Sequence, residues 1–121
     1  MTVPGPVTDE RLPLYTSNTF EIPGLELEQH LGLCWGLIVV SLGFGRSLTG
    51  GFAALSAGEV TEFTQAVDEA RRGALFRMVE HAKALGGNAI VGVRFDSNSL
   101  GEGAALAEFV AYGSAVVVKT G

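Results

Sequence analysis

Residues 37–40 read Leu-Ile-Val-Val, residues 89–93 read Ala-Ile-Val-Gly-Val, and residues 115–118 read Ala-Val-Val-Val. Successive side chains of a strand point to opposite faces, so an unbroken apolar run predicts a strand that needs cover on both faces. The sequence offers one helix, and one helix shields only one face of a small sheet. We therefore expect the second face to meet another copy of the chain or a partner.

The apolar runs lie inside longer strand candidates, which we predict over residues 25–42, 89–96 and 108–119. A helix is predicted over residues 59–85, and a brief strand over residues 17–22. The order strand, helix, strand, strand predicts an α+β fold in which the last two long strands form an antiparallel hairpin.

The N-terminal residues 1–16 are predicted to form a flexible arm, because they contain Pro4, Pro6 and Pro13. The remaining residues, 17–121, are predicted to form a single domain, since a chain of 121 residues buries one modest core.

The strand predicted over residues 25–42 has two unlike faces. Its odd positions carry the bulky residues Leu27, Leu31, Leu33, Trp35, Leu37 and Val39. Its even positions are small in the middle, at Gly32, Cys34 and Gly36. We expect the bulky face to pack on the helix, and the small face to let another backbone or subunit approach.

The predicted helix has one apolar stripe, because apolar residues recur in it at three- and four-residue steps. The stripe consists of Val60, Phe63, Val67, Ala70, Ala74, Met78, Ala82 and Leu85. Gly86 and Gly87 predict the C-terminal stop. His81 lies near that end and is predicted to be a solvated residue that the helix dipole favours.

Composition excludes some functions and favours self-association. The chain has 13 acidic and 8 basic residues and a net charge of −5, which argues against binding nucleic acid or an anionic membrane. Hydrophobic residues make up 47% and charged residues 17%, few charges for a monomer surface. The most apolar window, residues 31–44, is shorter than the roughly 20 residues of a spanning helix. A single cysteine favours a reducing, cytoplasmic location.

His30 and Cys34 are the weak candidates for metal ligands. On a regular strand they share a face but lie roughly 13 Å apart, at 3.3 Å per residue. One subunit therefore cannot place both on one ion, although a symmetric ring can bring copies of either residue together. The simpler interpretation, a buried thiol and a surface histidine, is favoured. The sequence leaves the cofactor unknown: a metal ion stays possible, but no ligand cluster supports one.

Gly45, Arg46 and Ser47 lie in a predicted connector between the first long strand and the helix. Arg46 can bind an anion beside exposed backbone amides, or it can pair with a carboxylate of a neighbouring subunit. We favour the pairing between subunits. The segment lacks the complete glycine pattern of a dinucleotide loop and the Gly-Lys-Ser/Thr of a P-loop.

Arg94 and Asp96 fall on one face of the second long strand, and Tyr112 lies on the third. Arg94 and Asp96 can form a binding pair, but a local salt bridge is the simpler interpretation. Together with Tyr112 they are also the best candidates for a shared enzyme site. No serine has a nucleophile-elbow context, so catalysis is not the favoured reading.

Four segments, residues 58–64, 69–71, 82–96 and 111–118, together with the Gly-Arg-Ser loop at 45–47, resemble the YbjQ family, which is also named for heavy-metal binding. The resemblance extends over residues 18–119. It implies a dodecin-like βαββ subunit with a three-stranded antiparallel sheet behind one long helix. It also implies a pentameric ring with additional short strands at the subunit contacts. No metal ligand is carried over, because the sequence has no cysteine or histidine cluster.

We therefore expect a small cytoplasmic homo-oligomer, a pentamer by resemblance, that binds or scaffolds rather than catalyses. The candidate ligand or interface residues are Gly45, Arg46, Ser47, Arg94, Asp96 and Tyr112. Three alternatives stay open: a metal-binding module, an enzyme with an intersubunit site, and a membrane-associated assembly that uses the apolar segment 31–44.

Overall fold

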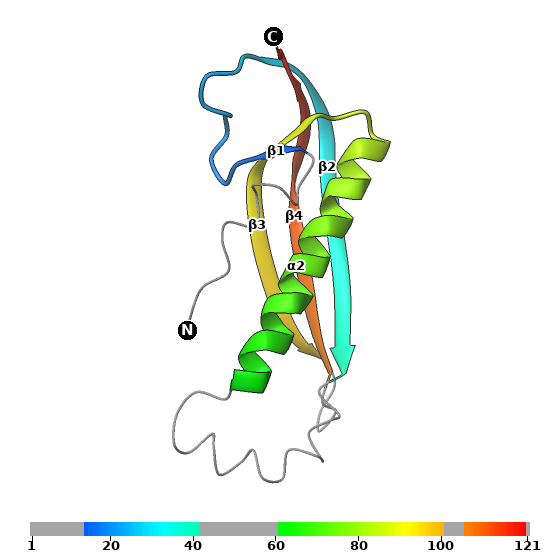
Figure 1. The fold of residues 1–121 in the computed structure, drawn as a ribbon. Helices are drawn as coiled ribbons and strands as arrows, with labels where there is room; N and C mark the ends of the chain where they lie inside the picture. Colours follow the sequence, from blue (N-terminus) through cyan, green and yellow to red (C-terminus); the bar gives the residue numbers. More distant parts are fainter. Residues whose placement is uncertain (1–13, 42–60, 101–105, 121) are drawn as a thin grey trace.

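In the computed structural model, one helix lies across one face of a four-stranded sheet (Figure 1). The structure describes residues 14–41, 61–100 and 106–120. The strands are β1 (Tyr15–Thr16), β2 (Leu27–Ser41), β3 (Ala89–Leu100) and β4 (Leu106–Val118), and the helix is α2 (Thr61–Ala84). Their order in the sheet is β1-β3-β4-β2, so β2 forms one edge.

The long elements confirm the predicted α+β order, whereas the predicted three-stranded antiparallel sheet is wrong in one respect. β3 and β4 form the expected antiparallel pair, and β4 also pairs antiparallel with β2. β1, however, adds a fourth strand that runs parallel to β3, with Tyr15 opposite Ala89. The sheet is therefore mixed.

The brief strand predicted over residues 17–22 is not formed, because local side-chain bonds turn the chain there. The Thr19 backbone N–H donates to Ser17 Oγ at 3.0 Å, and Thr19 Oγ1 donates to the Glu21 carbonyl at 3.0 Å. Serine and threonine bonds of this kind offer the backbone an alternative to a sheet ladder. The strand in this region is limited to the two residues of β1, and Ser17 and Thr19 still make backbone hydrogen bonds to Ile90, Gly92 and Val93 of β3.

The prediction of which face of β2 meets the helix is also wrong. Cys34 and Gly36 are buried under α2, whereas the bulky odd positions from Leu33 to Val39 point to the other side of the sheet. Leu31, which lies at the register shift, packs against the core under the helix. A Cβ placed on Gly36 would overlap the Ala74 carbonyl oxygen and the Met78 amide nitrogen. The small face is therefore the one that the helix approaches, and its missing side chains bring the two backbones into contact.

The helix ends as the paired glycines predict. Gly86 has a φ of 94°, a left-handed conformation that glycine adopts without strain. The Gly87 N–H donates to the Ala82 carbonyl at 2.9 Å, and the Gly86 N–H donates to the Lys83 carbonyl at 2.9 Å. These bonds satisfy two of the last carbonyls of α2. Leu85 lies beyond the helix and is 40% exposed, so it does not extend the buried stripe.

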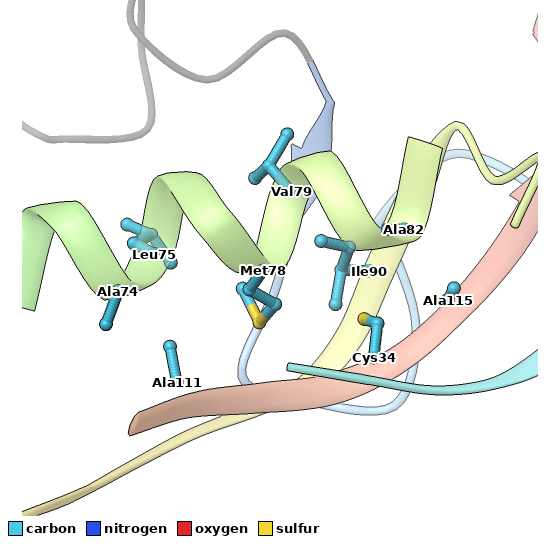
Figure 2. Close-up of a cluster of buried hydrophobic side chains, with 9 residues drawn as sticks. All are labelled: Cys34, Ala74, Leu75, Met78, Val79, Ala82, Ile90, Ala111 and Ala115. Atoms are coloured by element: carbon cyan, nitrogen blue, oxygen red, sulfur yellow. The ribbon is translucent and has the colours of Figure 1, made fainter. Parts of the chain in front are cut away.

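The main core lies between α2 and the sheet (Figure 2). It consists of Cys34, Ala74, Leu75, Met78, Val79, Ala82, Ile90, Ala111 and Ala115. Four of these nine residues are alanines, which is consistent with the close approach of the helix at Gly36. The predicted helix stripe is thus confirmed over Ala74, Met78 and Ala82.

A second, smaller cluster lies on the opposite face of the sheet, at one end only. Ile22 and the half-buried Leu25 reach it from the segment before β2. The strands contribute Ala89, Val91, Val116 and Val118. The segment leading into β2 therefore covers part of the face that α2 leaves open, and the rest of that face carries the candidate site.

Candidate functional site on the uncovered sheet face

An apolar column runs along β2 on the sheet face away from α2. We call it the β2 column; it consists of Leu33, Trp35, Leu37 and Val39. These side chains are 39–60% exposed. A soluble monomer rarely exposes a contiguous apolar patch without a binding role, although scattered apolar residues are ordinary. Sequence reasoning found the apolar run but placed these side chains against the helix.

Trp35 begins a row of three side chains that crosses this face. Tyr112 of β4 lies directly opposite Trp35, and Arg94 of β3 lies directly opposite Tyr112 on its other side. Residues directly opposite one another share a face, so an indole, a phenol and a guanidinium stand side by side. The structure thus brings Arg94 and Tyr112 together, as the sequence suggested, and adds Trp35, which the sequence did not single out as a site residue.

Asp96 lies one row farther along β3, on the same face as Arg94, and interacts with Tyr112. A hydrogen bond to the Asp96 carboxylate raises the pKa of the Tyr112 phenol, burial and the carboxylate charge raise it further, and the Arg94 charge lowers it. The phenol is therefore held in its neutral, donating form.

Arg94 does not form the local salt bridge with Asp96 that the sequence suggested. Its Nη1 donates instead to the carbonyl oxygens of Asn18 and Val93, both at 2.9 Å. Within the described ranges, the ion pair that the structure shows joins Arg72 to Asp68 on α2, at 2.7 Å. Arg94 consequently ties the segment before β2 to the sheet, and the Asp96 carboxylate is left to Tyr112.

Two side chains of α2 reach the outer edge of β2. His81 Nδ1 accepts a hydrogen bond from the Trp35 backbone N–H at 3.1 Å. Arg77 Nη1 donates to the Leu37 carbonyl at 2.7 Å. His81 is therefore a half-buried residue with a backbone partner, not the solvated residue that its position in the sequence suggested. No sequence signal identifies this contact, because it depends on how close the helix lies to the strand edge.

The two weak metal-ligand candidates lie on opposite faces of the sheet. A register shift between His30 and Gly32 inserts one extra residue into β2, and Gly32 has a φ of 118°. His30 consequently lies opposite Val116 of the second cluster, while Cys34 lies opposite Gly113 under the helix. The expectation that both share one face is wrong, because the bulge breaks the two-residue alternation.

The Cys34 thiol is a poor ligand for a soft metal. Burial raises its pKa to about 11, and its Sγ donates to the Gly113 carbonyl at 3.6 Å, which lowers the pKa to a lesser extent. Metal ions bind the thiolate rather than the thiol. Among the described residues, no group of three or more histidine, cysteine, aspartate or glutamate side chains is arranged to hold a metal ion.

The Gly45, Arg46 and Ser47 segment lies outside the described residues, so its predicted role at a subunit junction stays a prediction. None of the helices in the described part of the chain has the length and apolar character that a membrane span requires.

Comparison with known proteins agrees with the resemblance read from the sequence. The model of the YbjQ family, described as "Putative heavy-metal-binding", matches residues 14–119. The chain belongs to the YbjQ family. A UPF0145 protein of Methanoregula boonei is 46% identical over 98 residues, which cover 81% of this chain and 80% of that protein.

Other YbjQ relatives come from distant organisms. A UPF0145 protein of Saccharolobus solfataricus is 45% identical over 103 residues, covering 85% of this chain and 89% of its own. A UPF0145 protein of Bradyrhizobium is 41% identical over 101 residues, which cover 84% of this chain and 89% of that protein. A solved structure from Pediococcus pentosaceus, of unknown function and assigned to the DUF74 family, matches with a TM-score of 0.48 and 14% identity, over 88% of this chain and 98% of that one. The names of these relatives state no reaction.

The metal-binding description of the YbjQ family does not fit the donor atoms that this structure presents. Cys34 is buried, His30 lies on the opposite face, and His81 Nδ1 is bonded to the Trp35 N–H. With no group of three or more potential ligands in the described ranges, these residues cannot provide the four converging ligands of a soft-metal site. The residues that do converge in the described part of the chain are Trp35, Tyr112, Arg94 and Asp96.

Proposed function

We propose that this YbjQ protein works as a homo-oligomer of dodecin-like subunits, a pentameric ring by family resemblance, and that it binds or scaffolds rather than catalyses. The observation that carries this proposal is the exposed β2 column. The proposed location is the cytoplasm, which the single cysteine supports.

Burial of the β2 column supplies a large driving force for association. Fully burying one large apolar side chain stabilises a structure by roughly 1.5–3 kcal/mol. Four such side chains, already 40–61% buried in the single chain, retain about half of that gain for an interface. Their spacing at every second residue of one strand makes the surface contiguous, which a protein partner can cover in one contact.

Two exposed phenylalanines on the other side of the sheet support a ring over a two-fold dimer. Phe95 of β3 lies opposite Ala111 on the helix side and is 40% exposed, and Phe76 of α2 is 37% exposed. The β2 column and these phenylalanines therefore lie on different faces of the subunit. Two different surfaces that meet head to tail produce a closed ring when the rotation closes.

At Trp35 and Leu37, the contacts at the edge of β2 favour subunits that pack through their sheet faces over subunits that pair their strand edges. The Trp35 N–H and the Leu37 carbonyl are already bonded to His81 and Arg77, so they are not available to a strand from another subunit. Short strands at subunit contacts, which the resemblance implies, would have to form elsewhere in the chain.

An enzyme with an intersubunit site is the second candidate, and one observation favours it. Tyr112, Arg94 and Asp96 converge beside the β2 column, so a neighbouring subunit that covered the column would border them. Native mass spectrometry of the purified assembly would detect a small molecule retained there. A metal-binding function has no comparable support in the described residues.

The proposal is tested with a charge placed on the β2 column. Leu33 is 60% exposed in the single chain, so Leu33→Glu should leave the subunit folded and shift its mass in light scattering toward a single chain. Gln65→Glu, on the exposed side of α2, adds the same charge away from the column and should keep the wild-type mass. Equal masses for wild type and Leu33→Glu would overturn the role of the column.

A further inference from the structure

The outer edge of β2 is closed by two hydrogen bonds of different chemistry. Arg77 donates to the Leu37 carbonyl, and a guanidinium keeps its charge over the whole physiological range. His81 accepts from the Trp35 N–H through Nδ1 at 3.1 Å. This second bond exists only while Nδ1 carries no proton.

The protonation state of His81 follows from this geometry. A neutral imidazole has one donor nitrogen and one acceptor nitrogen, whereas a protonated ring has two donors. With Nδ1 accepting, the proton of the neutral ring resides on Nε2. Protonation of Nδ1 would point one N–H at another, so the contact with Trp35 cannot survive in its present form.

We propose that His81 is a pH-sensitive latch that holds α2 against the edge of β2 when neutral and releases Trp35 when protonated. The indole is part of the same device, because the rings of Trp35 and His81 meet edge to face with centroids 4.4 Å apart. Release therefore frees the Trp35 backbone N–H and changes the surroundings of the indole. This inference does not depend on the proposed oligomer.

The charges around His81 come mainly from its own helix. Arg77 lies one turn earlier, on the side of α2 that faces the edge of β2, and Glu80 and Lys83 flank His81 in sequence. Residues 31–41 of β2 contain no acidic or basic side chain, and their one titratable group is the buried Cys34 thiol. Protonated His81 would share the edge with the Arg77 cation and no carboxylate from residues 31–41 of β2, which favours movement of the ring away from the strand.

The chain carries its own reporter for this latch. Trp35 is the single tryptophan of the sequence, and His81 is one of two histidines. Tryptophan emission, followed from pH 8 to pH 5, should change through a one-proton transition. Because the other histidine, His30, is exposed and has no contact with the indole among those the structure shows, His30→Gln should keep the transition.

The decisive variant is His81→Asn, because an asparagine Oδ1 can accept a hydrogen bond where Nδ1 does and does not take up a proton in this range. We expect it to abolish the pH transition of the Trp35 emission. In wild type, the protection factor of the Trp35 amide against hydrogen exchange should fall by about two- to tenfold from pH 8 to pH 5, the loss expected for one hydrogen bond. The protection factor of the same amide in His81→Asn should stay constant.

The latch would be overturned by an emission transition that persists in His81→Asn, by one that disappears in His30→Gln, or by an unchanged Trp35 protection factor in wild type. If His81→Asn failed to fold, wild-type amide exchange alone would decide between the two outcomes. Light scattering at the same pH values separates this result from the oligomer proposal, since the latch predicts local release whether or not the mass changes.

Discussion

Gly36 of β2 lies against the backbone of α2, where a Cβ would overlap the carbonyl oxygen of Ala74. This contact determines which face of β2 the helix covers. Because the helix sits on the small residues, the bulky residues of the same strand are left on the opposite side. The uncovered apolar column is thus a direct consequence of the close approach at Gly36.

Gly36→Ala should destabilise the fold, because the obstructing atoms belong to the helix backbone and cannot rotate away. Overpacking of a tight core costs about 1–3 kcal/mol, and we expect a loss of unfolding free energy in this range by urea denaturation. Gly73→Ala is the matched control, since its Cβ would meet only the end of the Ile38 side chain at 3.2 Å. Similar stabilities for the two variants would show that the contact is not tight.

The pKa of the Tyr112 phenol should be higher than that of an ordinary tyrosine, because the Asp96 carboxylate accepts its hydrogen bond. The neutral phenol is favoured in the folded state, so its contribution to stability is present below pH about 10 and is lost as pH rises through the raised pKa. Asp96→Asn removes the charge and should shift the phenol titration toward lower pH. A pH titration in the alkaline range, followed by the absorbance of tyrosinate, measures this shift.

The chain contains two tyrosines, Tyr15 and Tyr112, so the titration needs an assignment. Tyr112→Phe leaves the Tyr15 signal alone and identifies the upper transition by its loss. If Asp96→Asn left the titration of Tyr112 in place, the Asp96–Tyr112 hydrogen bond would not be the main cause of the raised pKa.

Cys34 should be unreactive in the folded protein, because burial raises the pKa of its thiol from the ordinary 9.0 to about 11. Reagents for thiols react with the thiolate, so ionisation alone slows the reaction at pH 8 by about 100-fold, and burial slows it further. We expect slow labelling by an aromatic disulfide reagent, and one equivalent of rapid labelling after unfolding in guanidinium. Rapid labelling of the native protein would contradict the buried position.

The same thiol predicts how the protein behaves toward metals. Protein purified without added metal should contain no stoichiometric zinc or copper by elemental analysis, and Cys34→Ala should bind as much added metal as wild type. Metal retained at one equivalent by wild type and lost in Cys34→Ala would show that the thiol is a ligand despite its burial.

The sequence was sufficient for the long elements, since unbroken apolar runs and a three-to-four-residue stripe depend only on local pattern. It was insufficient to predict which face of β2 packs against the helix, because two effects oppose each other. Bulky residues bury more apolar area, whereas small residues let a helix backbone approach. The approach at Gly36 decided in favour of the small residues, and this depends on the position of α2.

Features of the candidate site divide in the same way. Arg94 and Asp96 share a face by simple alternation, which the sequence predicts. The relation between His30 and Cys34 was mispredicted, because the bulge at Gly32 reverses the alternation and no residue pattern fixed its position. The bond from the Trp35 backbone to His81 joins residues 46 positions apart and could only come from the packing of the helix.

We expect another copy of the chain to cover the β2 column. Sedimentation velocity of the wild-type protein at micromolar concentration distinguishes a covered column from an exposed one. A covered column requires one species whose mass is a small whole multiple of the chain, five by family resemblance. A folded species with the mass of one chain, stable in solution with Leu33 and Val39 exposed to water, would contradict it.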